Sequence, residues 1–95
     1  MLLLSRQLGE AIVIDNHVIA TLAVLANDFV EFSLSDINGA NSSSIVTVGK
    51  KELTAIVAGV RAVFVRKDAH KARLGFEYPP EIRIDRREFW VAPPR

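Results

Sequence analysis

The chain has 95 residues, of which 49% are hydrophobic and 24% charged, and its formal net charge is +1. This length supports one small domain, and the composition is typical of a globular rather than a disordered protein. Because the sequence has no cysteine, it excludes disulfides, zinc–thiolate sites and a cysteine nucleophile. No apolar run approaches the roughly 18 residues of a membrane span, and no basic n-region precedes the apolar start. We therefore expect a cytoplasmic protein that does not associate with membranes.

The charges are distributed unevenly along the chain. Residues 1–48 hold one basic and five acidic side chains, a net charge of −4, whereas residues 49–95 hold eleven basic and six acidic side chains, a net charge of +5. This division favours an anion-binding surface in the second half, because clustered basic residues are typical of nucleic-acid binding. A solvated basic face without a ligand is the alternative, and charge alone leaves both open.

Strands dominate the predicted secondary structure. In chain order they cover residues 2–7, 18–25, 30–35, 45–48, 50–58, 60–66, 72–77 and 82–85. Residues 72–77 show the alternation of apolar and polar side chains expected for a half-buried strand. Residues 60–66 form a continuous aliphatic run, which favours deeper burial. Turn-forming pairs such as Asp15-Asn16 and Pro79-Pro80 separate the strands.

The predicted strands form an internal repeat of 42 residues. Residues 18–24 align without a gap with residues 60–66. The same shift pairs residues 3–6 with 45–48, residues 30–34 with 72–76, and Glu10 with Glu52. We therefore expect a single domain, residues 1–95, made of a first repeat over about residues 1–43 and a second over about residues 44–95.

Two blocks of the sequence share the pattern of a known family. The first is MLLLSRQLGE at residues 1–10, and the second is VRAVFVRKDAHKARLGFEYPPEIRIDRREFW at residues 60–90. Both resemble the carbon storage regulator family, CsrA/RsmA, whose members are small RNA-binding translational regulators. In that family two five-stranded protomers interlock as a dimer. The resemblance does not extend to residues 37–43, INGANSS. As a whole it implies an all-β pseudo-dimer within one chain, with two interlocked antiparallel sheets and nine to ten short strands.

The resemblance also implies a composite RNA site. In the family, the first strand of one protomer and the fifth strand of the other together read a GGA element, commonly in a hairpin loop near a ribosome-binding site. Here such a site joins residues 2–7 to residues 81–87. The candidate RNA-binding residues are Leu4, Ser5, Arg6, Gln7, Ile82, Arg83, Ile84, Asp85, Arg86, Arg87 and Phe89. Leu4 would offer an apolar surface to a base, and Arg86 a guanidinium to guanine or phosphate.

The equivalent second site is expected to be lost. At the position of Arg6 the second repeat has Val48. Three further positions differ in the first repeat, where Ala40, Ser42 and Ser44 stand in place of Ile82, Ile84 and Arg86. We therefore expect one RNA site per chain. The strand at residues 45–48 has two possible roles, the fifth strand of the first repeat or the first strand of the second.

Other functions have weaker support. No nucleophile–base pair, metal-ligand cluster or phosphate-binding glycine-rich loop is visible in the sequence, so we expect neither an enzyme nor a metal or cofactor site. The alternative function is a protein-interaction module or antagonist that pairs with CsrA-type regulators. Without the resemblance, Leu4 would be interpreted as a core residue, and Phe89 and Trp90 as residues that cover the end of the core rather than stack on RNA. We expect a monomeric pseudo-dimer, with a homodimer as the alternative.

Overall fold

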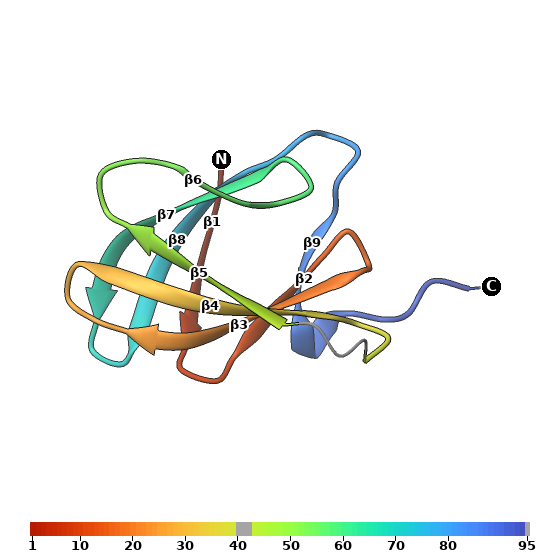
Figure 1. Cartoon of the computed structure of the whole chain (residues 1–95), viewed down its shortest axis with the longest axis horizontal. Coiled ribbons are helices and arrows are strands. Elements are labelled where there is room, and N and C mark those ends of the chain that lie inside the picture. The colour runs from red at the N-terminus through yellow and green to blue at the C-terminus, as the bar shows by residue number, and fades with distance from the viewer. Residues whose placement is uncertain (40–42, 95) are drawn as a thin grey trace.

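The described part of the chain forms nine strands and one short helix (Figure 1). The computed structural model describes residues 1–39 and 43–94. The elements are β1 (Leu2–Gln7), β2 (Ala11–Ile14), β3 (Val18–Leu25), β4 (Phe29–Asp36), β5 (Ser43–Gly49), β6 (Thr54–Val57), β7 (Val60–Asp68), β8 (Lys71–Glu77), β9 (Ile84–Arg86) and the 3₁₀-helix η1 (Arg87–Phe89). Sheet A has the order β1-β8-β7-β6 and sheet B the order β5-β4-β3-β2-β9, with antiparallel pairing throughout. The predicted all-β fold with two antiparallel sheets and nine to ten strands is confirmed.

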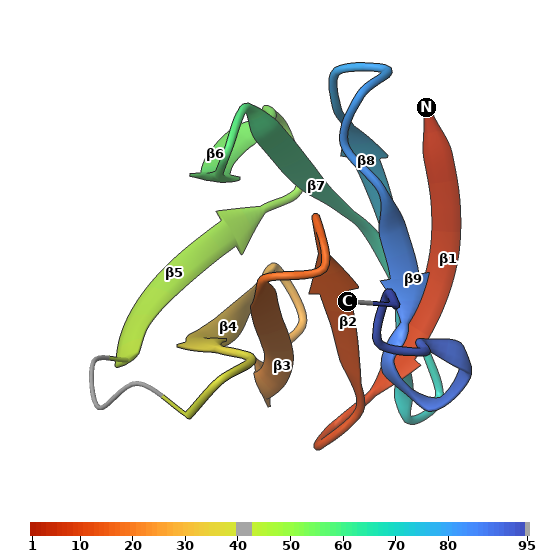
Figure 2. The ribbon, with the colours of Figure 1, turned by 90° about the vertical axis from the view of Figure 1, so that its right-hand side faces the viewer.

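Each sheet contains one strand from the other half of the chain. β1 pairs with β8, with Leu4 opposite Leu74, and β9 pairs with β2, with Ile84 opposite Ile14. These opposed residues are apolar and pack in the core, which fixes the register, since a shift by one residue would turn them to solvent. We expected β1 to lie against residues 81–87. Its hydrogen-bonding partner is β8 instead, and β9 forms the edge of sheet B (Figure 2).

The β5–β4–β3 and β1–β8–β7 pairings coincide after a shift of 42 residues, whereas the β6–β7 pairing has a register shift between Ala55 and Val57 that the β2–β3 pairing lacks. Ile45 lies opposite Ser33 between β5 and β4, just as Leu3 lies opposite Gly75 between β1 and β8. The register also shifts at equivalent places, between Leu22 and Val24 in one half and between Phe64 and Arg66 in the other. β5 therefore has the place in sheet B that β1 has in sheet A, and corresponds to a first strand rather than a fifth.

Sheet A has no counterpart of β9 in the part of the chain that the structure describes. β6 corresponds to β2 and forms the edge of sheet A where a tenth strand would pair. Residues 37–39 belong to a turn, in which the Gly39 N–H donates to the Asp36 carbonyl at 3.0 Å. The compared positions Ala40 and Ser42 lie outside the described residues.

Two segments differ from the sequence-based expectation. β2 was not predicted, because its four residues are all apolar and show no alternation; all four are buried. The expected strand at residues 81–87 is shorter, since only Ile84–Arg86 is extended within β9. The Ile82 N–H donates to the Pro79 carbonyl at 3.0 Å, so a turn occupies the residues that precede β9.

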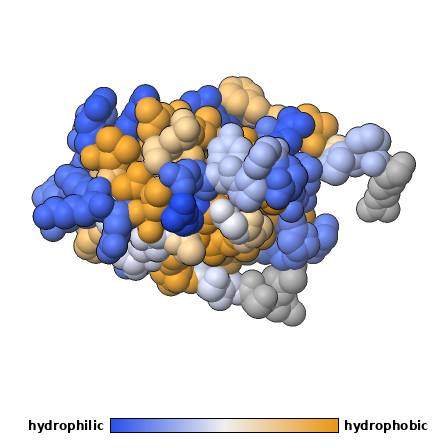
Figure 3. Space-filling model, turned by 90° about the horizontal axis from the view of Figure 1, so that it is seen from above, coloured by the Kyte–Doolittle hydropathy of each residue, from blue (hydrophilic) through white to orange (hydrophobic). Residues whose placement is uncertain are grey.

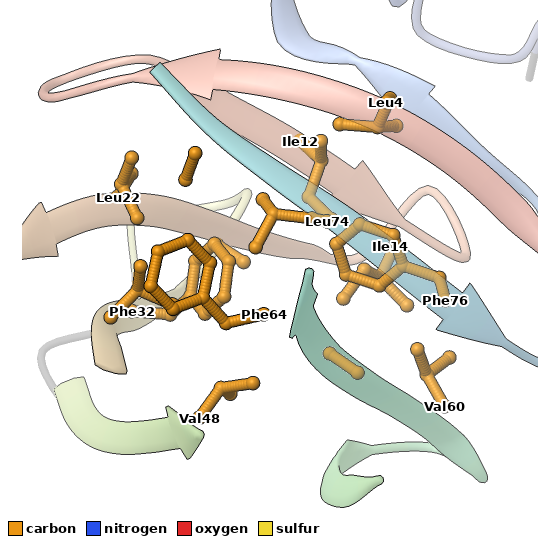
Figure 4. Close-up of a cluster of buried hydrophobic side chains, with 14 residues drawn as sticks. Leu4, Ile12, Ile14, Leu22, Phe32, Val48, Val60, Phe64, Leu74 and Phe76 are labelled. Atoms are coloured by element: carbon orange, nitrogen blue, oxygen red, sulfur yellow. The ribbon is translucent and has the colours of Figure 1, made fainter. Parts of the chain in front are cut away.

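One hydrophobic cluster holds the two sheets together (Figure 4). Its largest fully buried side chains are Phe32 of sheet B and Phe64 and Phe76 of sheet A. The rings of Phe32 and Phe76 meet at a centroid distance of 6.5 Å with a tilt of 55°, an arrangement that aromatic pairs prefer. Ile82 and Ile84 pack against this cluster from the C-terminal side, so the core anchors the segment that carries β9.

Candidate nucleic-acid interface

Arg6 is buried, although it is charged. Along β1 the side chains of Leu4 and Arg6 point inward, and only 4% of Arg6 is exposed. Its Nη1 donates to the Glu88 carboxylate and to the Ala11 carbonyl, at 2.8 and 3.1 Å, and its Nη2 donates to the other Glu88 oxygen at 2.8 Å. A planar guanidinium satisfied in this bidentate way is the usual solution for a buried arginine. The guanidinium of Arg6, which was predicted to contact RNA, therefore donates its hydrogen bonds to groups of the protein itself.

The Arg6–Glu88 pair shifts the ionisation of both groups. The hydrogen bonds from Arg6 lower the pKa of Glu88 to about 2, from a usual value of 4.5. The hydrogen bond with Glu88 raises the pKa of Arg6, and Glu10, with a carboxylate oxygen 3.8 Å from Arg6 Nε, acts in the same direction. Both partners therefore stay charged over the whole physiological range. The pair joins the edge strand of sheet A to the turn that follows the edge strand of sheet B.

Leu4 belongs to the core. Its side chain is 5% exposed and packs in the central cluster. This burial leaves no side-chain face for a base, so Leu4 could meet RNA only through its backbone. β1 is an edge strand of sheet A, and an edge strand presents backbone N–H and C=O groups that have no partner strand. Part of this edge already bonds within the chain, because the Ser5 carbonyl accepts from Arg6 Nε at 2.9 Å, the Gln7 N–H donates to Glu10 Oε1 at 2.7 Å and the Gln7 carbonyl accepts from the Glu10 N–H at 3.0 Å.

The other face of β1 carries Leu3, Ser5 and Gln7, and its polar C-terminal part borders a basic pair. Ser5 lies opposite Arg73 and Gln7 opposite Lys71 across the β1–β8 pairing. Ser5 is half-buried and Gln7 exposed. Since directly opposed residues of antiparallel strands point to the same face, Lys71 and Arg73 place two positive charges beside β1. Sequence reasoning missed both residues, although the alternation of residues 72–77 already places Arg73 on the outward face.

β9 and η1 present the exposed arginines of the site. Arg83 forms an ion pair with Asp85 at 2.8 Å, so its charge is partly compensated. Arg86 and Arg87 are exposed, and neither has an acidic partner within 4 Å among residues 1–39 and 43–94. Arg87 lies over the ring of Trp90, 5.6 Å from its centroid. Phe89 is 71% exposed and does not cover the core.

The equivalent positions of the other half are electrostatically different. Val48, at the place of Arg6, is fully buried and lies opposite Val30. Phe29 and Glu31 occupy the places that Lys71 and Arg73 have beside β1. At these compared positions, therefore, basic side chains lie on only one side of the pseudo-symmetric fold.

Comparisons of the chain with models of protein families, with curated proteins and with solved structures found no match. In the described ranges, no helix is long and apolar enough to cross a membrane. The same ranges contain no group of three or more His, Asp or Glu side chains placed to hold a metal ion. The chemistry of the candidate site therefore follows from its own residues alone.

Proposed function

We propose that this protein is an RNA-binding post-transcriptional regulator that recognises GGA-containing hairpin loops near ribosome-binding sites of cytoplasmic transcripts. The observation that carries the proposal is the position of Arg86 and Arg87. They are exposed and have no acidic partner within 4 Å in the described part of the chain. Arg86 stands two residues and Arg87 one residue before Glu88, which Arg6 ties to the edge strand β1. An edge strand beside exposed arginines offers both kinds of contact that a single-stranded loop needs.

The chemistry of the site matches an unpaired base with its phosphates. Backbone groups along β1 can hydrogen-bond base edges as a neighbouring strand would. The fork of Arg86 suits the O6 and N7 atoms of guanine, or a phosphate. Arg87 and the outward pair Lys71 and Arg73 are suited to phosphates, which set affinity rather than sequence preference. Arg6 acts here as a positioning residue that holds η1 against β1.

The asymmetry of charge supports one RNA site per chain. Where the proposed site has Arg6, Arg73 and Lys71, the other half of the fold has Val48, Glu31 and Phe29. An acidic and an aromatic side chain in these places would not attract phosphate. A one-to-one complex is therefore expected.

Titration of a labelled GGA-loop hairpin, followed by gel shift and fluorescence anisotropy, tests the proposal. Wild type should bind at a ratio of one RNA per chain, and Arg86→Ala should weaken binding by about 5- to 150-fold, the range for a bidentate base contact. Arg61→Ala is the matched control, because Arg61 lies on β7 in an ion pair with Glu77. No binding by wild type, or equal losses in the two variants, would contradict the proposal.

A second candidate is a module or antagonist that pairs with CsrA-type regulators. One observation favours it: the edge strand β6 has the position that β2 has beside β9. Val57, which lies opposite Val60 as Ile14 lies opposite Val18, is only half-buried, whereas Ile14 is fully buried. The face in Figure 3 also carries a hydrophobic patch bordered by hydrophilic residues. The fifth strand of such a regulator would complete sheet A here. A complex with a CsrA-type protein in size-exclusion chromatography, together with no binding of the hairpin, would favour this function.

A further inference from the structure

A pocket lies next to Arg87, at the end of the proposed RNA site. It has a volume of about 440 Å³, within the range of small-molecule sites. Its lining residues are Asn16, Ile37, Asn38, Arg87, Trp90, Ala92, Pro93 and Pro94. They come from the turn after β2, the turn after β4 and the segment that follows η1 (Figure 1). Arg87, which lines the pocket, directly follows Arg86, the proposed base contact, so the pocket adjoins the proposed RNA site.

Two tight turns hold the asparagines of the pocket in place. Asp15 and Asn16 both have positive φ, 55° and 56°, and the His17 N–H donates to the Ile14 carbonyl at 3.0 Å. The Ile37 N–H donates to the His17 carbonyl at 2.8 Å and so ties one turn to the other. The Asn38 N–H donates to Asp36 Oδ1 at 2.7 Å. These hydrogen bonds lie within the protein, so they hold the two asparagine-bearing turns in place without a ligand.

The side chains of the pocket offer a flat surface and amide groups. Trp90 Nε1 donates to Asn16 Oδ1 at 2.8 Å, which fixes the indole and leaves the NH₂ of Asn16 to donate elsewhere. The guanidinium carbon of Arg87 lies 5.6 Å from the centroid of the Trp90 ring. Asn38 brings a second carboxamide, and a carboxamide can pair with the N6 and N7 atoms of adenine. Indole and guanidinium planes are the surfaces on which bases stack.

The charge of the lining separates this pocket from four others in the described residues. Each of those is lined by at least one acidic residue, Asp28 with Glu52 in one, Asp36 in another and Glu77 in two. The pocket beside Arg87 has no acidic lining residue and one arginine. It therefore suits a ligand that carries a phosphate next to an aromatic ring.

We propose that this pocket binds an unpaired adenine that flanks the hairpin read by the β1–β9 site, with the base stacked on Trp90 or Arg87 and its Hoogsteen edge paired with Asn38. The inference rests on the proposed RNA function for the identity of its ligand. It adds a second contact point, outside the GGA element, that selects transcripts by the nucleotide beside the hairpin.

Fluorescence of Trp90, the single tryptophan of the chain, reports on the pocket directly. A GGA hairpin with a single-stranded adenine tail should quench this fluorescence, and the same hairpin with an abasic tail should not. Asn38→Ala should weaken binding of the adenine-tailed hairpin by about fivefold or more and leave binding of the abasic hairpin unchanged. Asn27→Ala, an exposed asparagine between β3 and β4, is the matched control.

The possible results separate the pocket from the main site. Equal affinity for the two hairpins, with unchanged Trp90 fluorescence, would overturn the pocket and leave the proposed function standing. If neither hairpin binds, the proposed function fails, and AMP alone is then titrated to millimolar concentration. Unchanged fluorescence with AMP overturns the pocket as well, whereas quenching that Asn38→Ala abolishes supports it independently.

Discussion

Arg6 and Glu88 are separated by 82 positions in the sequence, yet two parallel hydrogen bonds of 2.8 Å join their side chains. Arg6 lies on the first strand of the chain, and Glu88 in the turn after the last strand. The contact therefore fastens the edge of sheet A to the edge of sheet B at the place where the proposed RNA site lies. Stability and RNA binding should both depend on it.

Acid should weaken the fold through Glu88. Because the pKa of Glu88 is about 2 in the folded chain and 4.5 normally, the folded state binds this proton less readily than the unfolded state. Its contribution to stability is complete above about pH 4.5 and is lost as the pH falls from 4.5 towards 2. Urea midpoints of wild type and Glu88→Gln between pH 6 and pH 2 should converge on acidification. A constant difference across this range would refute the assignment.

Removing Glu88 alone should cost more than removing both partners of the pair. Glu88→Ala leaves the buried guanidinium of Arg6 without its counter-charge, which is strongly destabilising. Arg6→Met leaves the Ala11 carbonyl without its donor, at a cost of about 1–3 kcal/mol, and the half-exposed Glu88 carboxylate can hydrate. A double-mutant cycle in urea should therefore give a favourable coupling. Glu77→Ala, which breaks an exposed pair with Arg61, should have little effect.

An arginine at position 48, the counterpart of Arg6 in the other half, should destabilise the fold rather than create a second RNA site. Val48 is fully buried, and no counterpart of Glu88 stands opposite it among the described residues. Val48→Arg should lower the free energy of unfolding by about 3–5 kcal/mol, the cost of an uncompensated buried charge. The neighbouring Ile45 is 68% exposed, so Ile45→Arg is the control and should melt within a few degrees of wild type. A stable Val48→Arg variant would show that this half can accommodate the charge.

Two glycines should respond differently to alanine. Gly59 has φ of 78° in the turn between β6 and β7, where a Cβ would also approach Pro79 Cγ at 3.2 Å. Gly59→Ala should cost about 1–2 kcal/mol from the left-handed backbone alone. Gly75 does not have a left-handed backbone, and a Cβ there would meet the sulfur of Met1 at 2.6 Å, the end of a flexible side chain that can turn away. The Cβ would also lie 3.2 Å from Val63 Cγ1 and 3.3 Å from Leu3 Cδ2, which need to move by only a few tenths of an ångström. Thermal unfolding should rank Gly59→Ala below Gly75→Ala, and the reverse order would contradict this reasoning.

Salt dependence should distinguish the two exposed arginines of the proposed site. If Arg87 contacts a phosphate, Arg87→Ala should reduce the slope of log affinity against log salt by about 1 and preserve the preference for GGA over a scrambled loop. Arg86→Ala should reduce that preference instead. Anisotropy titrations at several salt concentrations with both loops measure the two quantities. Identical behaviour of the variants would remove the distinction between base and phosphate contact.

Much of the fold could be predicted because the apolar pattern is local. Alternation in residues 72–77 and the aliphatic run at residues 60–66 correspond to β8 and β7. β2 was not predicted, because a four-residue apolar segment without alternation has no distinctive period. The exchange of β1 between the halves came only from the family resemblance, since alternation does not say which strand is the neighbour.

The site was less predictable than the fold. The family resemblance predicted that Arg6 and Arg86 belong to the same site, but it did not show that Arg6 would be buried. That outcome depends on Glu88, 82 positions away, and on the Ala11 carbonyl. The Trp90 pocket joins three segments through one backbone hydrogen bond between two turns and the side-chain hydrogen bond from Trp90 to Asn16, and neither contact leaves a periodic signal in the sequence.

The exchange of edge strands also governs the order in which the chain can fold during synthesis. β1 leaves the ribosome first, but its partner β8 begins 64 positions after β1 ends. At about 5–20 residues per second, β1 waits roughly 3 to 13 seconds without its neighbour. β2 and β3 can form a hairpin meanwhile, while β1 keeps an apolar edge exposed. Such long-range pairing slows folding, so the nascent chain passes through a period in which capture by a chaperone, or pairing with another nascent copy, competes with completion of the fold.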